Sequence, residues 1–159
     1  MSGIFLSLGS NLGERKENLA LALKKISGLA RLVKTSGIYE SAPVGFTDQP
    51  FFFNICAEIE TELSPPELLS ELKQIEISMG RIKTARNGPR VIDLDIIFFR
   101  KQKIVSQNLT IPHARYRERL FVLLPLCEIA DFVPPGEEMT LSVLCNLVTD
   151  QQCRLIGRI

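Results

Sequence analysis

Hydrophobic positions along the chain follow two different spacings. Two stretches repeat their apolar residues as one face of an amphipathic helix does. These residues are Leu19, Ala22, Leu23 and Ile26 in the first stretch, and Leu68, Leu72, Ile75 and Met79 in the second. Apolar runs at 4–7, 31–41, 51–62 and 91–99 predict strands instead. Residues 121–130 and 140–148 predict two further helices, on either side of a Pro-Pro-Gly turn.

The order of these elements is β-α-β-β-α-β followed by helices. This order is the split unit of ferredoxin-like folds, so we expect an α+β protein with a ferredoxin-like core in an α-β-α sandwich. Nothing in residues 1–159 divides the chain, and we expect one domain.

Local signals place the ends of both helices. Ser64, Pro65 and Glu67 form a capping box with proline at the first helical position, and Gly80 ends that helix. Asn11 stands three residues before Glu14 and predicts a similar start for the first helix. Capping and a turn account for the glycines of SLGSNLGE, which match neither the P-loop nor the G-x-G-x-x-G motif.

Composition argues against several classes of function. Nineteen Lys and Arg stand against 18 Asp and Glu, a net charge of +1 that argues against a protein that wraps nucleic acid. The four cysteines form no Cys-x-x-Cys pair, and one histidine cannot complete a familiar zinc set, so buried free thiols are expected. No signal peptide and no membrane-spanning run is visible, which predicts a soluble, cytoplasmic protein.

Two aspartates interrupt the apolar run at 91–99. Because side chains alternate along a strand, Val91, Asp93, Asp95, Ile97 and Phe99 are expected on one face, and Ile92, Leu94, Ile96 and Phe98 on the other. The aspartates are then roughly 6.6 Å apart along the strand. They can converge on one cation or bracket two cations roughly 3.5–4 Å apart. The alternative is that each aspartate forms an ion pair with a nearby arginine.

The basic segments beside this strand favour a phosphate ligand. Arg81, Lys83, Arg86 and Arg90 lie in RIKTARNGPR without an acidic residue among them. Cations on a loop beside carboxylates suit a polyphosphate that carries Mg²⁺. His113, Arg115, Arg117 and Arg119 form a second basic cluster, which alone is a weak signal.

The stretch PFFFN at 50–54 combines an aromatic ring with an amide. Phe52 and Asn54 point to one side of the predicted strand, and Phe51 with Phe53 to the other. Core packing explains two of the phenylalanines. Phe52 beside Asn54 would suit a flat polar heterocycle.

Four segments together resemble the 6-hydroxymethyl-7,8-dihydropterin pyrophosphokinases of folate biosynthesis. They are SLGSNLGERKENL, YESAPVG followed by DQPFFFN, GRIKTARNGPRVIDLDI and LTIPHARYRERLFVLLPL. The resemblance runs from about Ile4 to Ala130 and thins after residue 131. It implies a monomeric enzyme that transfers the β,γ-pyrophosphoryl group of ATP to the pterin hydroxymethyl group and releases AMP.

The resemblance also implies roles for individual residues. Asp93 and Asp95 would hold two Mg²⁺ ions, and Arg81, Lys83, Arg86 and Arg90 would belong to a mobile catalytic loop. The expected ATP contacts are Glu76, Ile96, Thr110, His113 and Arg119. The expected pterin contacts are Phe52, Asn54 and Phe121, with Ser41, Pro43, Val44 and Gly45 as the adjoining backbone wall.

Two other functions fit part of this pattern. A ferredoxin-like RNA-binding module would use the Phe and Arg clusters, but Asp93 and Asp95 would repel the RNA backbone. A metal-dependent phosphohydrolase would share the acids and pass phosphate to water. Pterin-dependent release of AMP separates the pyrophosphokinase from both.

Overall fold

The structure is a computed structural model that describes residues 3–45, 47–82 and 88–159. Its strands are β1 (Ile4–Ser10), β2 (Arg31–Thr35), β3 (Ile38–Ser41), β4 (Phe52–Glu60), β5 (Asp93–Phe99), β6 (Ile104–Val105), β7 (Thr110–Ile111) and β8 (Cys153–Gly157). Its helices are α1 (Arg15–Ile26), α2 (Pro65–Ser78), α3 (Leu120–Ile129) and α4 (Leu141–Leu147), with a 3₁₀ turn at Tyr116–Glu118.

One antiparallel sheet runs through the molecule in the order β5-β1-β4-β3-β8, with β2 also paired to β4. The prediction of mixed helix and sheet is confirmed. The single strand predicted at 31–41 is wrong, because the chain breaks between β2 and β3. There the Gly37 N–H leaves the ladder and donates to both Glu128 carboxylate oxygens, at 3.1 and 3.0 Å.

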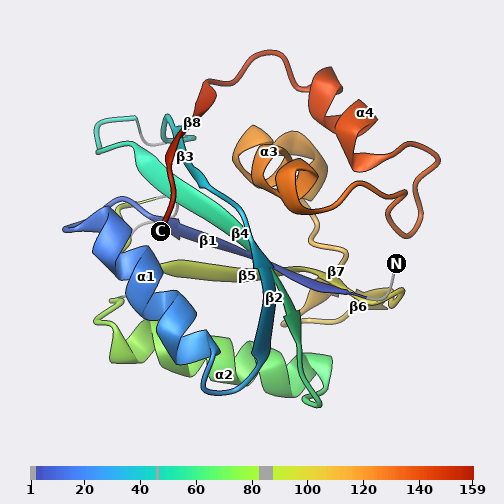
Figure 1. The fold of residues 1–159 in the computed structure, drawn as a ribbon, viewed down its shortest axis with the longest axis horizontal. Coiled ribbons are helices and arrows are strands. Elements are labelled where there is room, and N and C mark those ends of the chain that lie inside the picture. The colour runs from blue at the N-terminus through green and yellow to red at the C-terminus, as the bar shows by residue number, and fades with distance from the viewer. Residues whose placement is uncertain (1–2, 46, 83–87) are drawn as a thin grey trace.

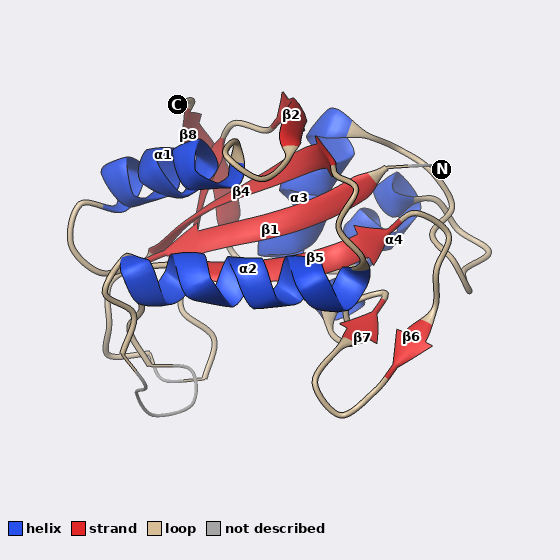
Figure 2. Ribbon diagram, turned by 90° about the horizontal axis from the view of Figure 1, so that it is seen from below, coloured by secondary structure: helices blue, strands red, loops and turns tan. Residues whose placement is uncertain are grey.

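Helices cover both faces of this sheet. Figure 1 shows α1 and α2 on one side and α3 with α4 on the other. Figure 2 shows α1 and α2 crossing the same face, while the β6–β7 hairpin stands apart from the main sheet. Each face has its own buried apolar cluster, one containing Leu8, Leu19 and Leu72 and the other Phe98 and Leu123. The layers are therefore helix, sheet and helix.

The second helix starts as predicted and the first does not. Ser64 accepts from the Glu67 N–H while the Glu67 side chain accepts from the Ser64 N–H, which is the predicted capping box. In α1, Glu14 is the N-cap residue and no side chain caps the helix. Asn11 lies before it, is 1% exposed and turns towards other loops. The predicted Asn11 cap is wrong.

A register shift in β5 changes which residues share a face. Leu6 of β1 pairs with Ile96, and its neighbour Phe5 pairs with Phe98, so Ile97 is an extra residue in the ladder. Phe98 therefore lies with Ile97 in the α3 cluster, and Phe99 lies in the α1–α2 cluster. The predicted faces of Phe98 and Phe99 are wrong, whereas Asp93 and Asp95 precede the shift and keep a common face.

The cysteines are free thiols, as expected, but only Cys56 and Cys145 are buried; Cys127 and Cys153 are partly exposed. Within the described ranges, no helix has the length and apolar character needed to cross a membrane.

Candidate active site

Asp93 and Asp95 lie where two cavities meet. Their β1 partners in the sheet are Gly9 and Ser7, on the face that α3 covers. Both aspartates line a cavity of about 400 Å³ and also a second cavity of about 350 Å³. The two cavities therefore share this carboxylate pair.

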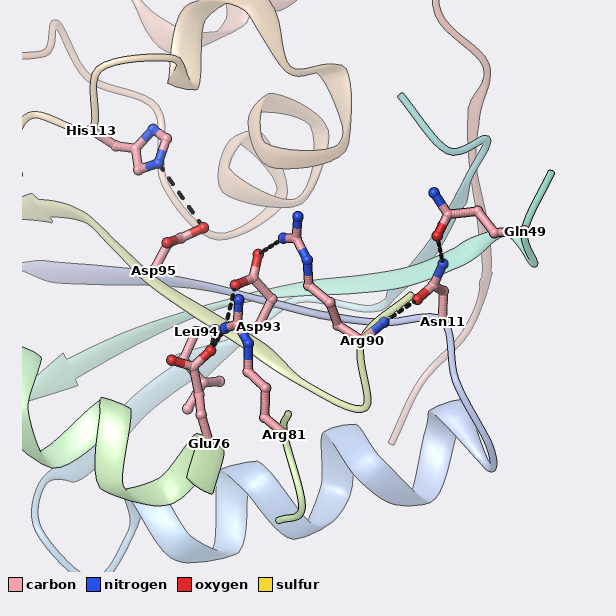
Figure 3. A network of polar contacts seen from close by, with 9 residues as sticks. All are labelled: Asn11, Gln49, Glu76, Arg81, Arg90, Asp93, Leu94, Asp95 and His113. Carbon is pink, nitrogen blue, oxygen red and sulfur yellow. Dashed lines mark hydrogen bonds and ion pairs between the residues drawn. The ribbon is translucent and has the colours of Figure 1, made fainter. Parts of the chain in front are cut away.

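Asp93 is held between two arginines (Figure 3). Arg81 donates to its Oδ1 and Arg90 to its Oδ2, each at 2.8 Å. Arg81 also forms an ion pair with the buried Glu76, whose Oε2 accepts from the Leu94 N–H at 3.4 Å. Asp93 therefore forms the arginine pairs that the sequence offered as the alternative.

Asp95 has no such support. In the described part of the chain no hydrogen bond reaches its carboxylate, and the Nε2 atom of His113 is 4.0 Å away. Burial and the neighbouring charge of Asp93 raise the pKa of Asp95 to about 7, although Arg119, Arg90 and Arg81 act in the opposite direction. A cation at this position would stabilise the ionised carboxylate.

His113 is neutral at physiological pH. Burial and the charge of Arg119 lower its pKa to about 4. Its Nδ1 accepts from the Arg115 N–H at 3.1 Å, so the ring proton resides on Nε2, the nitrogen that faces Asp95.

The larger cavity contains most of the predicted pterin residues. Phe52, Asn54, Phe121, Ser41 and Val44 line it. Pro43 and Gly45 lie in the same loop as Val44 but are not among its lining residues.

Asn54 enters this cavity from β4 in a fixed orientation. The side chain is 2% exposed, and its Nδ2 donates to the Tyr39 carbonyl at 3.0 Å and to Ser41 Oγ at 2.8 Å. Both amide N–H groups are thus engaged within the protein. The Oδ1 oxygen, on the side of Gly9, is the group that can accept a hydrogen bond from a ligand.

The smaller cavity contains the predicted nucleotide residues, with some exceptions. It is lined by Glu76, Ile96, Thr110 and His113, which were predicted as ATP contacts, and by Arg81, which was predicted in the catalytic loop. Arg119 was predicted in this group, but it lines the larger cavity. Lys83 and Arg86 lie outside the described residues, so their contacts and the closure of their loop stay predictions.

The donor set suits a hard cation that also binds a ligand. Asp93 and Asp95 are carboxylates, and the described residues supply no cluster of three or more His, Cys, Asp or Glu side chains that would enclose a metal. Mg²⁺ typically takes one or two carboxylates and completes its shell with water and phosphate oxygens. The Asp95 carboxylate, which accepts no hydrogen bond from the described residues, fits that arrangement.

A model of the family described as 7,8-dihydro-6-hydroxymethylpterin-pyrophosphokinase (HPPK) matches residues 5–131. The chain belongs to this family. The match includes β1 from its second residue, β2 to β7 and the whole of α3. It therefore covers both cavities except for Leu147 at the end of α4 and the segment that follows it.

Whole-chain relatives agree with the family match. A 2-amino-4-hydroxy-6-hydroxymethyldihydropteridine pyrophosphokinase of Haemophilus influenzae is 43% identical over 154 residues, which are 95% of this chain and 96% of that protein. Folic acid synthesis protein fol1 of Pneumocystis carinii is 42% identical over 95% of this chain. The chain spans only 21% of that relative's length.

A crystal structure of Plasmodium falciparum HPPK-DHPS with pteroate shares the fold. The TM-score is 0.73 at 17% sequence identity, over 91% of this chain and 42% of that one. HPPK membership and the carboxylates facing both cavities do not favour the RNA-binding alternative.

Several residues that line the larger cavity were not predicted from the sequence. Ser7 and Gly9 line the larger cavity from β1, although Gly9 was assigned to a turn. Leu6 and Leu8, which alternate with Ser7 and Gly9, could have indicated a strand with a polar face. Leu147 at the end of α4 lines the same cavity, together with Val148, Asp150 and Gln151 of the segment that follows, beyond the part of the chain that the resemblance covers.

Proposed function

We propose that residues 1–159 act as one pyrophosphokinase domain. It transfers the β,γ-pyrophosphoryl group of ATP to the hydroxymethyl group of 6-hydroxymethyl-7,8-dihydropterin and releases AMP. The observation that carries this proposal is the shared position of Asp93 and Asp95 between two cavities, one lined by Phe52, Phe121 and three arginines and the other by Lys73 and Arg81. A two-substrate transfer needs its reacting groups to meet at such a junction.

The larger cavity takes the pterin. Phe52 of β4 and Phe121 of α3 supply flat apolar surfaces, and Asn54 Oδ1 accepts from the edge of the heterocycle. Gly9 leaves the floor open, since a Cβ there would lie 3.2 Å from Asn54 Oδ1 and 3.6 Å from the Phe52 ring. The hydroxymethyl group then points towards the aspartates.

The smaller cavity takes ATP. Four of the predicted contacts line it: Glu76, Ile96 and Thr110 would bind the nucleoside part of ATP, and His113 would bind its phosphates. Arg81 and Arg90, already at the aspartates, exchange part of their contact with Asp93 for the phosphates. Neutral His113 donates its Nε2 proton to a phosphate oxygen without adding a charge that must be desolvated.

Two Mg²⁺ ions held by Asp93 and Asp95 supply charge neutralisation of the triphosphate when they are bound. The hydroxymethyl oxygen loses its proton to solvent and forms a bond to the β-phosphorus. The bond from that phosphorus to the α–β bridging oxygen breaks, and AMP leaves with the bridging oxygen. Arg119, at the wall of the pterin cavity, and Arg90 hold the charge that develops on the transferred group.

The strand order β5-β1-β4-β3, with α1 and α2 on one face, supports the ferredoxin-like description of residues 4–99. A monomeric state and a cytoplasmic location belong to the same proposal. Sedimentation of the purified chain and cell fractionation test them.

Incubation with ATP, Mg²⁺ and the hydroxymethyl pterin tests the reaction, with AMP as the readout. The proposal expects AMP only when all three are present. Phosphate release without pterin would indicate the phosphohydrolase instead, and RNA binding without nucleotide turnover would indicate the binding module.

A further inference from the structure

The segment between α4 and β8 closes the pterin cavity, and Gln151 is its most connected side chain. Its Oε1 accepts from the Leu120 N–H at 3.0 Å, and its Nε2 donates to the Glu118 carbonyl at 2.5 Å. A single amide thus holds the backbone on both sides of Arg119. Arg119 and Phe121 are the residues that follow the two bonded residues, Glu118 and Leu120, in the chain.

The start of α3 needs such a partner. The first N–H groups of a helix have no acceptor within the helix. Arg119 is the N-cap residue of α3, and no side chain of the helix start caps it. Gln151 supplies the acceptor from 31 residues further along the chain.

Gln151 is also connected, through the strand that follows it, to the cavity residues Ser41 and Asn54. Two residues later, Cys153 of β8 pairs with Ser41 of β3, and Ser41 Oγ accepts from Asn54. Figure 1 shows β8 beside β3 and the preceding segment returning from α4. The described contacts therefore link the wall at Ser41 and Asn54 to the backbone that carries Arg119 and Phe121.

We propose that Gln151 is a positioning residue for this reaction, acting through Arg119 and Phe121. The inference rests on the proposed function and adds to it a residue beyond the family match at 5–131. Gln151 holds the 3₁₀ turn and the first turn of α3 in one geometry, so that Arg119 faces the aspartates while Phe121 faces the pterin.

Gln151→Ala in the full chain is the first variant, and Gln152→Ala is its matched control. Gln152 is the adjacent residue, of the same type and exposed, and it does not line the cavity. We expect Gln151→Ala to lower kcat about tenfold, the order of one hydrogen bond expressed in the transition state, with the control unchanged. Gln151→Glu keeps the acceptor for Leu120 and loses the donor to Glu118. Its kcat should therefore lie between those of Gln151→Ala and the parent.

A double-mutant cycle separates positioning from structure. If Gln151 acts through Arg119, Gln151→Ala should lower kcat by no more than about twofold in an Arg119→Ala background. Independent, multiplicative losses would overturn the proposal. So would a Gln151→Ala variant with the kcat of Gln152→Ala, even if its melting temperature had dropped.

Hydrogen exchange at the Leu120 amide gives a readout that does not depend on turnover. Gln151→Ala should accelerate exchange there by at least about tenfold, and Gln152→Ala should not. Unchanged exchange overturns the proposal. If the parent chain forms no AMP and Gln151→Ala still accelerates exchange at Leu120, the proposed function is refuted. The role of Gln151 in holding the start of α3 then stands.

Discussion

Asp93 and Asp95 share one face of β5, but in the described residues only Asp93 is paired with arginine. Asp93 is neutralised by Arg81 and Arg90 before any ligand binds. Asp95 is left with a neutral histidine at 4.0 Å and a raised pKa. The two carboxylates are therefore prepared differently for the same cation site.

Replacement of Asp95 by asparagine should abolish turnover, because the amide keeps the shape and loses the charge that binds Mg²⁺. We expect kcat to fall at least about a hundredfold, with Asp93→Asn similar, as for loss of a major electrostatic contact. AMP formation is the measurement. Glu62→Gln, an exposed acid away from both cavities, is the control, and near-parent rates in both aspartate variants would refute the metal assignment.

The stability of the metal-free protein should depend on Asp95. The folded-state pKa of about 7 lies above the unfolded value of about 3.9, so folding favours the protonated form. That contribution is complete below about pH 4 and is lost as the pH rises through about 7. In EDTA, Asp95→Asn should therefore exceed the parent in stability at pH 8, by about 1–2 kcal/mol after solvent screening, and equal it at pH 4. Urea unfolding at both pH values decides this, and an equal difference at the two would contradict it.

Phe52→Ala and Phe121→Ala should each weaken pterin binding about tenfold or more, through lost ring contact and burial. Binding of a non-hydrolysable ATP analogue should stay within about twofold, because neither ring lines the second cavity. Phe51→Ala is the control: it is the adjacent phenylalanine, 42% exposed and not part of either cavity wall. Titration calorimetry measures both ligands, and equal losses for pterin and nucleotide would favour simple core packing.

Gly9→Ala should weaken pterin binding without removing the fold. The new methyl group would lie 3.2 Å from Asn54 Oδ1, at the position where the pterin edge binds. We expect a loss of about tenfold in pterin affinity, as for a site overfilled by one methyl group. Gly157→Ala, in β8 with no atom near the added Cβ, is the control. Parent affinity in Gly9→Ala would mean that the pterin binds elsewhere.

The side chain of Asn11 is expected to stabilise the folded protein. Its Oδ1 accepts from the Arg90 N–H at 2.8 Å and its Nδ2 donates to Gln49 (Figure 3). Its backbone N–H also donates to the Arg90 carbonyl at 3.1 Å, and its Nδ2 to the Pro50 carbonyl. Asn11→Ala should cost about 1–3 kcal/mol, because buried polar groups lose their partners. Asn146→Ala on the exposed face of α4 is the control. Thermal unfolding of both variants gives the comparison, and equal melting temperatures would contradict a stabilising role for the Asn11 hydrogen bonds.

The sequence predicted the features that depend on local pattern. Helical spacing located α1 and α2, and Ser64 with Glu67 located the start of α2, because these signals act within a few residues. The pairing of Phe52 with Asn54 on one face was also predictable, since β4 is regular there.

Features that depend on distant partners could not be predicted in this way. Asn11 resembles a helix cap in sequence, but its bonds go to Arg90 and Pro50, which are far away along the chain. The bulge at Ile97 arises from the register with β1, and β8 is a short exposed strand defined only by its pairing with β3. Gln151 was missed for the same reason.

The most direct test of the central claim follows the β-phosphorus of ATP. The full chain is supplied with Mg²⁺, the hydroxymethyl pterin and ATP labelled at the β-phosphorus, and the products are separated. The account predicts that the label appears in the pterin diphosphate, with one AMP formed for each pterin consumed. Label recovered in ADP, or in phosphate and pyrophosphate without a labelled pterin, would contradict it.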